Sequence, residues 1–535
     1  MIHPLHSHPL CRGEDLGLPI PNSLHAVSVC LPTWADVIGY EEKESRVIDR
    51  MKTGYPRFFL HPLIQRVCEV LAPAEGFEVL PFSDEIAAQE CAALTGGTAK
   101  MVNGIPAAFF PSSAHASARA YWQHAGRILS SRAAEDWLKT QTLAPANPRL
   151  ELELRTRLAA WSGAEAEKIS LHPSGMAAIY AAFQTLLSRR PGKRMVMFGF
   201  PYTDTLKILQ KFGPGVEFFP RGDEADLQRL AELLQNETIA GIFCEVPSNP
   251  LLHTPNLPAL ADLGRRFDIP VVVDDTIGTS FNVDVLPHCD LVATSLTKAI
   301  SGEGDVLAGA LLCCSKRTDL ESFLPTTHGI YSRDLEVLEK NSRDFPERMQ
   351  ICNANALELA RFLSNHPAVE SVWHPSLDPS PAYNSLRMPR GGYGAVLSFL
   401  PKNAEKHTPE IFERLAVNHG ISLGTSYTLV CPYVQLAHYH ELDWARSCGI
   451  DPHLLRVAVG AEEQLLQLQL AEAGQPEVKI RLEQIRQFEV QKLLVPLGVL
   501  AGAVIHDPEG APLRRSQPFG HMHRRGLEAQ LARRF

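Results

Sequence analysis

Lys298 follows the apolar segment DLVATS at residues 290–295 and precedes a run rich in glycine. Lysine is the side chain whose amine forms a Schiff base with an aldehyde once its pKa is lowered. Ser295 and Thr297 place two hydroxyl groups beside it. The glycines that follow lack the Gly-x-Gly-x-x-Gly spacing, which argues against a dinucleotide site. Lys298 is therefore either a solvated loop lysine or an amine that carries a cofactor.

Three more segments offer groups for an anion and for a planar ring. Ser174-Gly175-Met176 opens a predicted helix, where N–H groups and the helix dipole favour a phosphate, although such a start can also be a simple cap. Tyr202 follows a predicted strand and could stack on a ring or pack against the sheet edge. Asn249 lies beside prolines in EVPSNPLL, so its amide is fixed in direction, either toward a ligand or in an Asx turn.

Charged residues occur in two of the predicted strands. Asp274 and Asp275 end the strand IPVVVDD, and because successive side chains point to opposite faces, only one of them faces a given ligand. A carboxylate there is costly unless it meets a cation, although the pair can also cap a helix. Arg456 lies in the apolar segment LLRVAVG, and a buried arginine usually pairs with a carboxylate, either of a ligand or of the protein itself.

Together these residues form the set that a pyridoxal phosphate site requires. The set contains phosphate donors, an aromatic ring for stacking, a carboxylate for a ring nitrogen, an amine for an aldehyde and an arginine for an amino-acid carboxylate. Each feature is weak by itself, but the combination predicts pyridoxal 5'-phosphate as the cofactor.

The elements that must position these residues are the strands of a mostly parallel sheet. From about residue 150 the sequence alternates helical segments with short, continuously apolar runs such as RMVMFGF and IPVVVDD. Continuous rather than alternating hydrophobicity is typical of strands buried on both faces of such a sheet. Ligands of these sheets lie beyond the carboxyl ends of the strands, where the polar residues named above follow. The predicted fold class is therefore α/β.

A chain of 535 residues is too long for one core and predicts several domains. We expect four regions along it. They are an N-terminal extension and subunit-contact region without clear strand–helix alternation at 1–150, a large cofactor-binding α/β domain at 151–330, a smaller C-terminal α+β domain at 331–475 and a tail of unknown role at 476–535.

Composition restricts the class of protein. Hydrophobic residues make up 45% and charged residues 21%, as in soluble globular proteins, and the net charge of −9 gives no drive toward nucleic acid. Eleven cysteines without a repeated spacing favour reduced thiols, and the N-terminal residues lack an apolar signal-peptide core, so we expect a cytoplasmic protein.

The longest apolar run, 493–505, is too short to span a membrane. The His438-x-His440 and His521-x-His523 pairs lack further ligands, so no metal site is expected.

The motifs that contain these residues resemble those of the cystathionine γ-synthase family of pyridoxal-phosphate enzymes, also called the Cys/Met-metabolism or trans-sulfuration group. The resemblance runs from about residue 126 to 475, in the motifs PSGMAAI, PYTDTLK, EVPSNPLL, VVVDDTIG, TSLTKAISGEGDVLAGA, ISLGTSYTL and LLRVAVGAEE. The long N-terminal region, with MKTGYPRFFLHP, resembles the extended fungal members. The fold implied is the aspartate aminotransferase-like fold type I of PLP-dependent transferases.

The resemblance implies a role for each matched residue. Lys298 matches the lysine that holds the cofactor, Asp274 the aspartate that keeps the pyridine nitrogen protonated, and Tyr202 the stacking tyrosine. Asn249 matches the partner of the ring 3-oxygen, and Arg456 the arginine that binds the substrate α-carboxylate. The phosphate donors are matched by Gly175, Met176, Ser295 and Thr297.

Several positions depart from the family pattern. The family's Tyr-x-Arg, which reaches the phosphate from a neighbouring subunit, is matched at best by Ser130-Ser131-Arg132, which places Arg132 at a shared site of a homodimer or homotetramer. Tyr427 stands where many members have glutamate, and Thr428 where they usually have a serine near the lysine. Asp275 replaces the commoner asparagine. These changes bear on the choice of substrate.

The activity that the resemblance implies is γ-substitution on an O-acylhomoserine. With L-cysteine as the nucleophile the products are L-cystathionine and a carboxylic acid, as in methionine biosynthesis. One alternative is an enzyme of a specialised-metabolite pathway that uses another sulfur or carbon nucleophile, and a second is a non-catalytic scaffold of the same fold. The implied partners are small amino-acid substrates and further copies of the chain, with no nucleic acid and no membrane.

Overall fold

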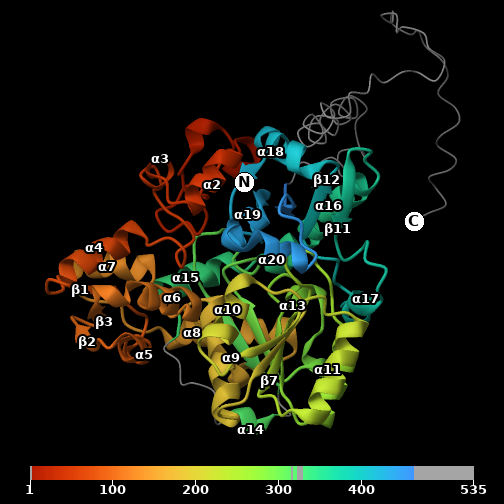
Figure 1. The fold of residues 1–535 in the computed structure, drawn as a ribbon. Coiled ribbons are helices and arrows are strands. Elements are labelled where there is room, and N and C mark those ends of the chain that lie inside the picture. The colour runs from red at the N-terminus through yellow and green to blue at the C-terminus, as the bar shows by residue number, and fades with distance from the viewer. Residues whose placement is uncertain (1–2, 315–316, 322–328, 463–535) are drawn as a thin grey trace, which may run out of the picture.

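Three β-sheets organise the computed structural model, which describes residues 3–314, 317–321 and 329–462 (Figure 1). The largest sheet has seven strands in the order β4-β10-β9-β8-β7-β5-β6. They are β4 (Ile169–His172), β5 (Met195–Phe198), β6 (Val216–Phe219), β7 (Gly241–Glu245), β8 (Val271–Asp274), β9 (Leu291–Ser295) and β10 (Gly309–Cys313). Strands β5 to β9 pair in parallel, and β10 is antiparallel to both neighbours. The predicted α/β fold with a mostly parallel central sheet is confirmed.

Helices cover both faces of this sheet, which explains the continuous apolar runs of its strands. They include α8 (Pro148–Ser162), α9 (Gly175–Arg189), α10 (Thr203–Lys211), α11 (Glu224–Asn236) and α12 (Leu257–Arg266). Val272 of β8 belongs to the hydrophobic core that contains Ile179 of α9. Its neighbour Val273 belongs to the core that contains Leu230 of α11, so successive side chains of β8 are buried on opposite faces.

A second sheet of five strands lies in the C-terminal part, in the order β11-β12-β15-β14-β13. The strands are β11 (Val369–Trp373), β12 (Val396–Pro401), β13 (Asn418–His419), β14 (Leu429–Pro432) and β15 (Leu455–Ala458). Two helices pack against this sheet, α16 (Phe345–Ser364) and α18 (Ala404–Arg414). The sheet lies within the region that the sequence predicts as a smaller α+β domain.

The N-terminal region holds a third sheet, which the sequence analysis missed. Its antiparallel strands are β1 (Phe77–Pro81), β2 (Thr98–Val102) and β3 (Ile105–Pro111), and the helices near it are α4 (Pro62–Leu71), α5 (Glu85–Thr95), α6 (His115–Ala125) and α7 (Ser131–Thr140). The edge strand β2 is largely exposed and therefore carries no apolar run. In β3 alanine and proline occupy positions where strand-forming residues are expected, so the periodicity was too weak to predict it.

Much of the segment 16–51 packs against the C-terminal sheet, although Val27 belongs to the core that includes the third sheet. Helix α2 (Trp34–Glu41) lies beside α18 and α19 (Tyr433–Ala437) in Figure 1. Val37 of α2 shares a hydrophobic core with Phe399 of β12 and Ile411 of α18. The start and the end of the described chain therefore build one core, and α2 reaches the junction between the two larger sheets.

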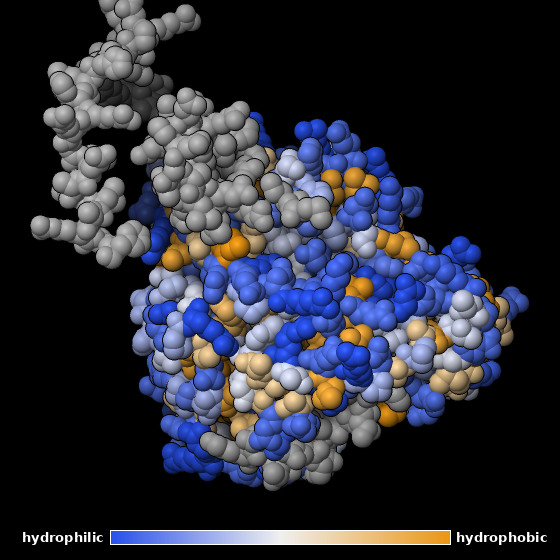
Figure 2. Space-filling model, turned by 180° about the vertical axis from the view of Figure 1, so that it is seen from behind, coloured by the Kyte–Doolittle hydropathy of each residue, from blue (hydrophilic) through white to orange (hydrophobic). Residues whose placement is uncertain are grey.

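The face of the molecule in Figure 2 is mostly hydrophilic, with hydrophobic residues in small separate groups. Within the described residues, no helix combines the length and the hydropathy that crossing a membrane requires. The predicted tail at 476–535, with His521 and His523, lies outside the described residues.

Candidate active site

A cavity of about 140 Å³ lies beyond the carboxyl ends of β7, β8 and β9. Its lining comes from these strand ends, from the C-terminal sheet and from the N-terminal extension. The structure brings eight of the predicted site residues into this lining, namely Gly175, Met176, Tyr202, Asn249, Asp274, Ser295, Lys298 and Arg456. Three other predicted residues, Arg132, Thr297 and Thr428, do not line it.

Lys298 lies between a hydroxyl group and an aromatic ring. Its Nζ donates a hydrogen bond to Ser422 Oγ at 2.9 Å and lies 4.4 Å from the centre of the Tyr55 ring. Burial, and to a smaller degree the neighbouring Arg456, lowers the pKa of Lys298, while Tyr55 acts in the opposite direction. The lowered pKa increases the fraction of neutral amine, which is the form that attacks an aldehyde.

Ser422 reaches Lys298 because a glycine allows two loops to touch. Gly424 has a φ of +74°, and a Cβ there would lie 2.5 Å from the backbone nitrogen of Ala299. Only glycine tolerates both the left-handed conformation and this approach. The loop after β13 is therefore held directly against the loop that carries Lys298.

The two aspartates at the end of β8 have different surroundings. Asp274 lines the cavity, whereas Asp275 is buried outside the lining. Burial raises the pKa of Asp274, and the N–H of Thr276, which donates to its Oδ1 at 2.9 Å, offsets part of that rise. A carboxyl group in this state is stabilised when a cation comes into contact with it. The structure thus directs Asp274, and not Asp275, toward any ligand of the cavity.

The start of α9 forms the wall opposite the aspartate. Ser174 caps the helix by accepting a hydrogen bond from the N–H of Ala177 at 3.0 Å. A Cβ added to Gly175 would lie 2.7 Å from Cβ of Ser295, so only glycine lets the helix start approach the end of β9 this closely. Free N–H groups of the first turn and the Ser295 hydroxyl together make a surface suited to a phosphate.

Arg456 on β15 is buried, with only 4% of its surface exposed. Its guanidinium donates to Asn249 Oδ1 at 3.3 Å and to the carbonyl oxygens of Ile421 and Ser422 at 3.3 and 3.1 Å. Its Nε has no hydrogen-bond partner, and among the residues that the structure describes no carboxylate pairs with it. The internal salt bridge that the sequence left open is therefore absent from the described part, and the cation is free to bind a ligand carboxylate.

Glu245 fixes two of the predicted residues in place. It accepts hydrogen bonds from the backbone N–H groups of Tyr202 at 2.5 Å and of Asn249 at 3.1 Å. The amide of Asn249 donates to the hydroxyl of Tyr433 at 3.1 Å. Glu245 thus holds the loops after β5 and β7 against each other. It is a positioning residue, and no signal in the sequence indicated this role.

Three residues that the resemblance implicated are engaged elsewhere. The hydroxyl of Thr297 accepts from the backbone N–H of Ala308 at 2.9 Å, and the hydroxyl of Thr428 accepts from that of Gly460 at 3.0 Å. Ser422, and not Thr428, is the hydroxyl beside Lys298. Tyr427 is fully buried and does not line the cavity, so it cannot contact a substrate there.

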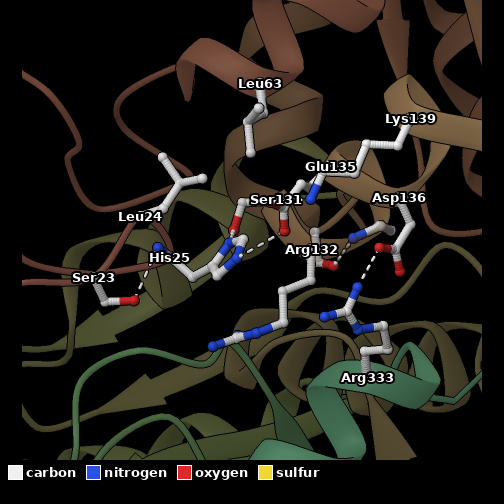
Figure 3. A network of polar contacts seen from close by, with 12 residues as sticks. Ser23, Leu24, His25, Leu63, Ser131, Arg132, Glu135, Asp136, Lys139 and Arg333 are labelled. Carbon is white, nitrogen blue, oxygen red and sulfur yellow. Dashed lines mark hydrogen bonds and ion pairs between the residues drawn. The ribbon is translucent and has the colours of Figure 1, made fainter.

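Arg132, predicted to reach a phosphate, is occupied within its own chain. Its Nη1 donates to the carbonyl oxygen of Asp305 at 2.7 Å and to Asp334 Oδ1 at 2.9 Å. Figure 3 shows Arg132 on α7, within a polar network that includes His25 of the N-terminal extension. If Arg132 turned toward a phosphate, the buried Asp334 would lose its cation, which would lower the stability of the fold by about 3–5 kcal/mol. The structure therefore gives no support to a phosphate contact by Arg132.

The cavity contains a Tyr-x-Arg pattern that the sequence analysis overlooked, Tyr55-Pro56-Arg57. Arg57 donates to the hydroxyl of Tyr202 at 2.7 Å and forms a buried ion pair with Asp204, while its Nε has no hydrogen-bond partner. Burial tends to raise the pKa of Tyr55, but Lys298 and Arg57 outweigh it, so the net pKa is lowered. The signal was present as GYPRFF, far upstream of the matched motifs, and the same chain supplies it to the cavity.

Arg57→Lys is expected to weaken cofactor retention about tenfold, because lysine keeps the charge but cannot contact both Asp204 and the Tyr202 hydroxyl, so the Tyr202 ring would be held less firmly. Bound cofactor would be measured from visible absorbance after dialysis. The matched control is Arg132→Lys, a buried arginine outside the cavity lining, which should retain cofactor as the wild type does. A larger loss in the Arg132 variant would instead restore the shared-site interpretation. Thermal unfolding of both variants separates this effect from loss of folding.

These observations fit pyridoxal phosphate. The cavity offers a primary amine at Lys298 and, at Asp274, a carboxyl group that has no cationic partner among the described residues. For the phosphate it offers the helix start at Gly175 and the hydroxyl of Ser295 at the end of β9. Tyr202 supplies an aromatic ring in the same lining. The cavity lining therefore contains a group of the type that the cofactor's aldehyde, ring nitrogen, phosphate and ring face each require.

Comparison with known proteins agrees with this geometry. The profile of the Cys/Met metabolism PLP-dependent enzyme family matches residues 145–467. A cystathionine gamma-synthase of Neurospora crassa is 32% identical over 597 aligned positions, which cover 84% of this chain and 96% of the relative. The L-2-amino-4-chloropent-4-enoate dechlorinase/desaturase of Streptantibioticus cattleyicolor is 33% identical, over 83% of this chain and 95% of its own length.

The fold is also shared with solved structures. Cystathionine gamma synthase from Xanthomonas oryzae pv. oryzae, in complex with cystathionine, superposes with a TM-score of 0.54 at 21% identity, over 66% of this chain and 86% of that one. The type I fold expected from the resemblance is therefore confirmed. From the family match, the relatives and the cavity, the chain belongs to the Cys/Met metabolism PLP-dependent enzyme family, and its cofactor is pyridoxal phosphate.

Proposed function

We propose that the protein catalyses γ-substitution on an O-acyl-L-homoserine, with L-cysteine as nucleophile and L-cystathionine as product, as in methionine biosynthesis. The observation that carries the proposal is the buried guanidinium of Arg456, which has no carboxylate partner in the described residues and shares a cavity with Lys298. An amino-acid substrate needs both an anchor for its α-carboxylate and an amine-bearing site for its α-amino group. The similarity to cystathionine gamma-synthase of Neurospora crassa supports the choice of reaction.

Different residues of the cavity would have different roles in this reaction. Pyridoxal phosphate, when bound, supplies the electron sink that makes the α-proton of an amino acid acidic. Lys298, with its lowered pKa, would take up and return protons at the substrate carbons. Arg456 would hold the α-carboxylate so that the α-carbon stays near Lys298. Ile421, Leu423 and Leu436 in the lining would exclude water from the reacting groups.

Arg456→Lys is expected to raise KM for the O-acylhomoserine about ten- to hundredfold with a smaller change in kcat, because a charge-assisted two-pronged contact becomes a point charge. Steady-state kinetics with the donor varied at saturating cysteine measure the effect. The matched control is Arg157→Lys, a partly buried arginine that pairs with Glu339 outside the cavity lining. An unchanged KM in the Arg456 variant would show that this arginine is purely structural.

Mass spectrometry of the products tests the proposed reaction itself. The purified holoenzyme would be incubated with O-acetyl-L-homoserine and, in separate reactions, with cysteine, sulfide and carbon nucleophiles. Cystathionine as the dominant product supports the proposal. Consumption of the donor with a different dominant product would assign the protein to a specialised pathway. No consumption of the donor or of any other amino acid, in a coloured holoenzyme, would favour the non-catalytic scaffold.

A second candidate function is the elimination of a leaving group from an unsaturated amino acid. It is favoured by the relative from Streptantibioticus cattleyicolor, which is 33% identical to this chain and whose name describes a dechlorinase/desaturase. A chlorinated amino acid therefore belongs in the same panel. Chloride release without addition of a nucleophile would support this candidate over γ-substitution.

We further propose that the protein is a homodimer or homotetramer, as the resemblance to the family implies. Because Tyr55 and Arg57 line the cavity from the same chain, this assembly does not depend on an arginine donated by a neighbour. Light scattering during size-exclusion chromatography measures the mass, and a monomer would contradict the proposal.

A further inference from the structure

Three carboxyl groups line the cavity, and two of them already have hydrogen-bond donors. Glu245 accepts from the N–H groups of Tyr202 and Asn249, and Asp274 accepts from that of Thr276. The third is Glu41, whose carboxyl has neither a hydrogen bond nor an ion pair within the described part of the chain. A half-buried carboxyl group at a substrate cavity is costly unless a ligand supplies its partner.

Glu41 comes from the N-terminal extension and is the last residue of the eight-residue helix α2. The carboxyl end of a helix carries partial negative charge, so a carboxylate there is repelled and a cation is attracted. Helix α2 packs against α19, and Leu436 and Ala437 of α19 belong to the same cavity lining. The extension therefore places the Glu41 carboxyl at one side of the cavity, with the Lys43 ammonium bound to the Tyr40 carbonyl oxygen at the end of the same helix.

The other charged residues of the cavity lining already have partners or proposed ligands, so none of them is available to pair with Glu41. Lys298 and Asp274 face the cofactor, Arg57 pairs with Asp204, and Arg456 is the anchor for the donor's α-carboxylate. A donor amino acid presents its own α-amino group to the cofactor held by Lys298, so it has no second cation for Glu41. Lys43 lies close by, but within the described residues it forms no ion pair with Glu41 and donates instead to the Tyr40 carbonyl oxygen. The second substrate is then the ligand that can bring a cation to the Glu41 carboxyl.

We propose that Glu41 binds the ammonium group of the nucleophilic co-substrate, so that the enzyme selects an amino thiol such as cysteine over sulfide or a thiol without an amino group. This inference rests on the proposed γ-substitution and specifies its second substrate. The site is the Glu41 carboxylate, which recognises a primary ammonium ion. The carbonyl end of α2 is not part of it, because Lys43 Nζ already donates to the Tyr40 carbonyl oxygen at 3.2 Å.

Protonation of Glu41 would switch this site off. Burial raises the pKa of Glu41 to about 7, and Lys43 partly opposes the rise. The other titratable groups that interact with it are the hydroxyls of Tyr40 on α2 and Tyr439 on the neighbouring segment, which remain neutral near pH 7 because their pKa values are raised. Since the folded pKa lies above the ordinary value, the carboxylate is present above about pH 7 and is lost as the pH falls below it.

The kinetic test compares Glu41→Gln with the wild type for two nucleophiles, L-cysteine and 3-mercaptopropionate, which lacks the amino group. Glu41→Gln should raise KM for cysteine about tenfold, the loss expected for one partly exposed charge-assisted contact. KM for 3-mercaptopropionate and KM for O-acetyl-L-homoserine should not change. The matched control is Glu42→Gln, the exposed neighbour whose carboxylate accepts from Tyr439 outside the lining, and it should behave as the wild type.

A binding measurement tests the same site without turnover. Holoenzyme reduced with borohydride, in which Lys298 no longer reacts with amines, would be titrated calorimetrically with S-methyl-L-cysteine and with 3-(methylthio)propionate. The wild type should bind the amino compound several-fold more tightly at pH 8 than at pH 6, and Glu41→Gln should abolish that difference. Because S-methylcysteine has no free thiol, thiol ionisation does not contribute to the pH dependence.

Each result has a defined consequence. A lower kcat in Glu41→Gln with unchanged KM for cysteine would make Glu41 a proton acceptor and overturn the ammonium site. Equal binding of both ligands by the wild type and Glu41→Gln would also overturn it. Failure to consume any O-acylhomoserine would refute the proposed function, and the calorimetric comparison would still decide whether Glu41 selects amino compounds.

Discussion

Lys298→Ala is expected to lower turnover by at least about 10³-fold, because the variant loses the group that moves protons at the substrate. It should also lose the cofactor adduct that borohydride traps on the wild type. The structural reason is that Lys298 is the lysine in the cavity lining of the described chain, hydrogen-bonded to Ser422 with its pKa lowered by burial. Peptide mapping of the reduced protein measures the adduct directly.

Lys207→Ala is the control for this experiment. Lys207 lies on α10 and pairs with Glu441 at 2.8 Å, outside the cavity lining. This variant should keep both the adduct and most of the activity. If the mapped adduct lay on Lys207 or on any lysine other than Lys298, the assignment of the cofactor lysine would be wrong.

Asp274→Asn should bind cofactor but lose about 10²- to 10³-fold in kcat, the usual cost of removing one electrostatic group from a reacting centre. The amide has the same shape as the carboxyl but cannot stabilise a protonated ring nitrogen by charge. Asp275→Asn should be mild, because Asp275 does not line the cavity.

The comparison of the two aspartates is informative because both are buried and adjacent. Burial raises the pKa of both aspartates, that of Asp275 to about 7. Burial alone therefore does not show which of the two contacts the cofactor. Kinetics with the donor varied, together with the visible spectrum of each variant, separate loss of catalysis from loss of cofactor. A stronger effect of Asp275→Asn than of Asp274→Asn would contradict the orientation of the strand end.

The sheet that carries Lys298 and Asp274 was predictable from the sequence because its signals are local. Strands such as β8 are buried on both faces, and burial requires an unbroken apolar run such as VVV at residues 271–273. Their carboxyl ends lie at one edge of the sheet, so the polar residues after them converge. The roles of Gly175, Lys298 and Arg456 in binding stay predictions, but their convergence in one cavity is now a structural fact.

The sequence does not by itself distinguish between similar residues, and the roles predicted for Thr297 and Thr428 stay predictions. Thr297 and Thr428 carry the hydroxyl groups that the motifs suggested, yet backbone N–H groups of neighbouring loops occupy both. Ser422 became the neighbour of Lys298 through the close contact at Gly424, and nothing in the local pattern indicates which loop makes that contact. A sequence motif does not show which of several hydroxyl groups lies beside Lys298, whereas the folded chain places Ser422 Oγ within 2.9 Å of its Nζ.

The α/β class, the family and the strand-end residues follow from the sequence, because hydrophobic periodicity and motif order are properties of contiguous segments. The contribution of the N-terminal extension depends on how the whole chain folds. Arg57 and Glu41 lie more than two hundred residues before Lys298. Glu41 reaches the cavity because helix α2 shares a core with the C-terminal sheet, and Arg57 because it pairs with the buried Asp204 of α10. Arg132 has a suitable charge but lies outside the cavity lining, paired with Asp334. Long-range packing, which no local pattern encodes, made that selection.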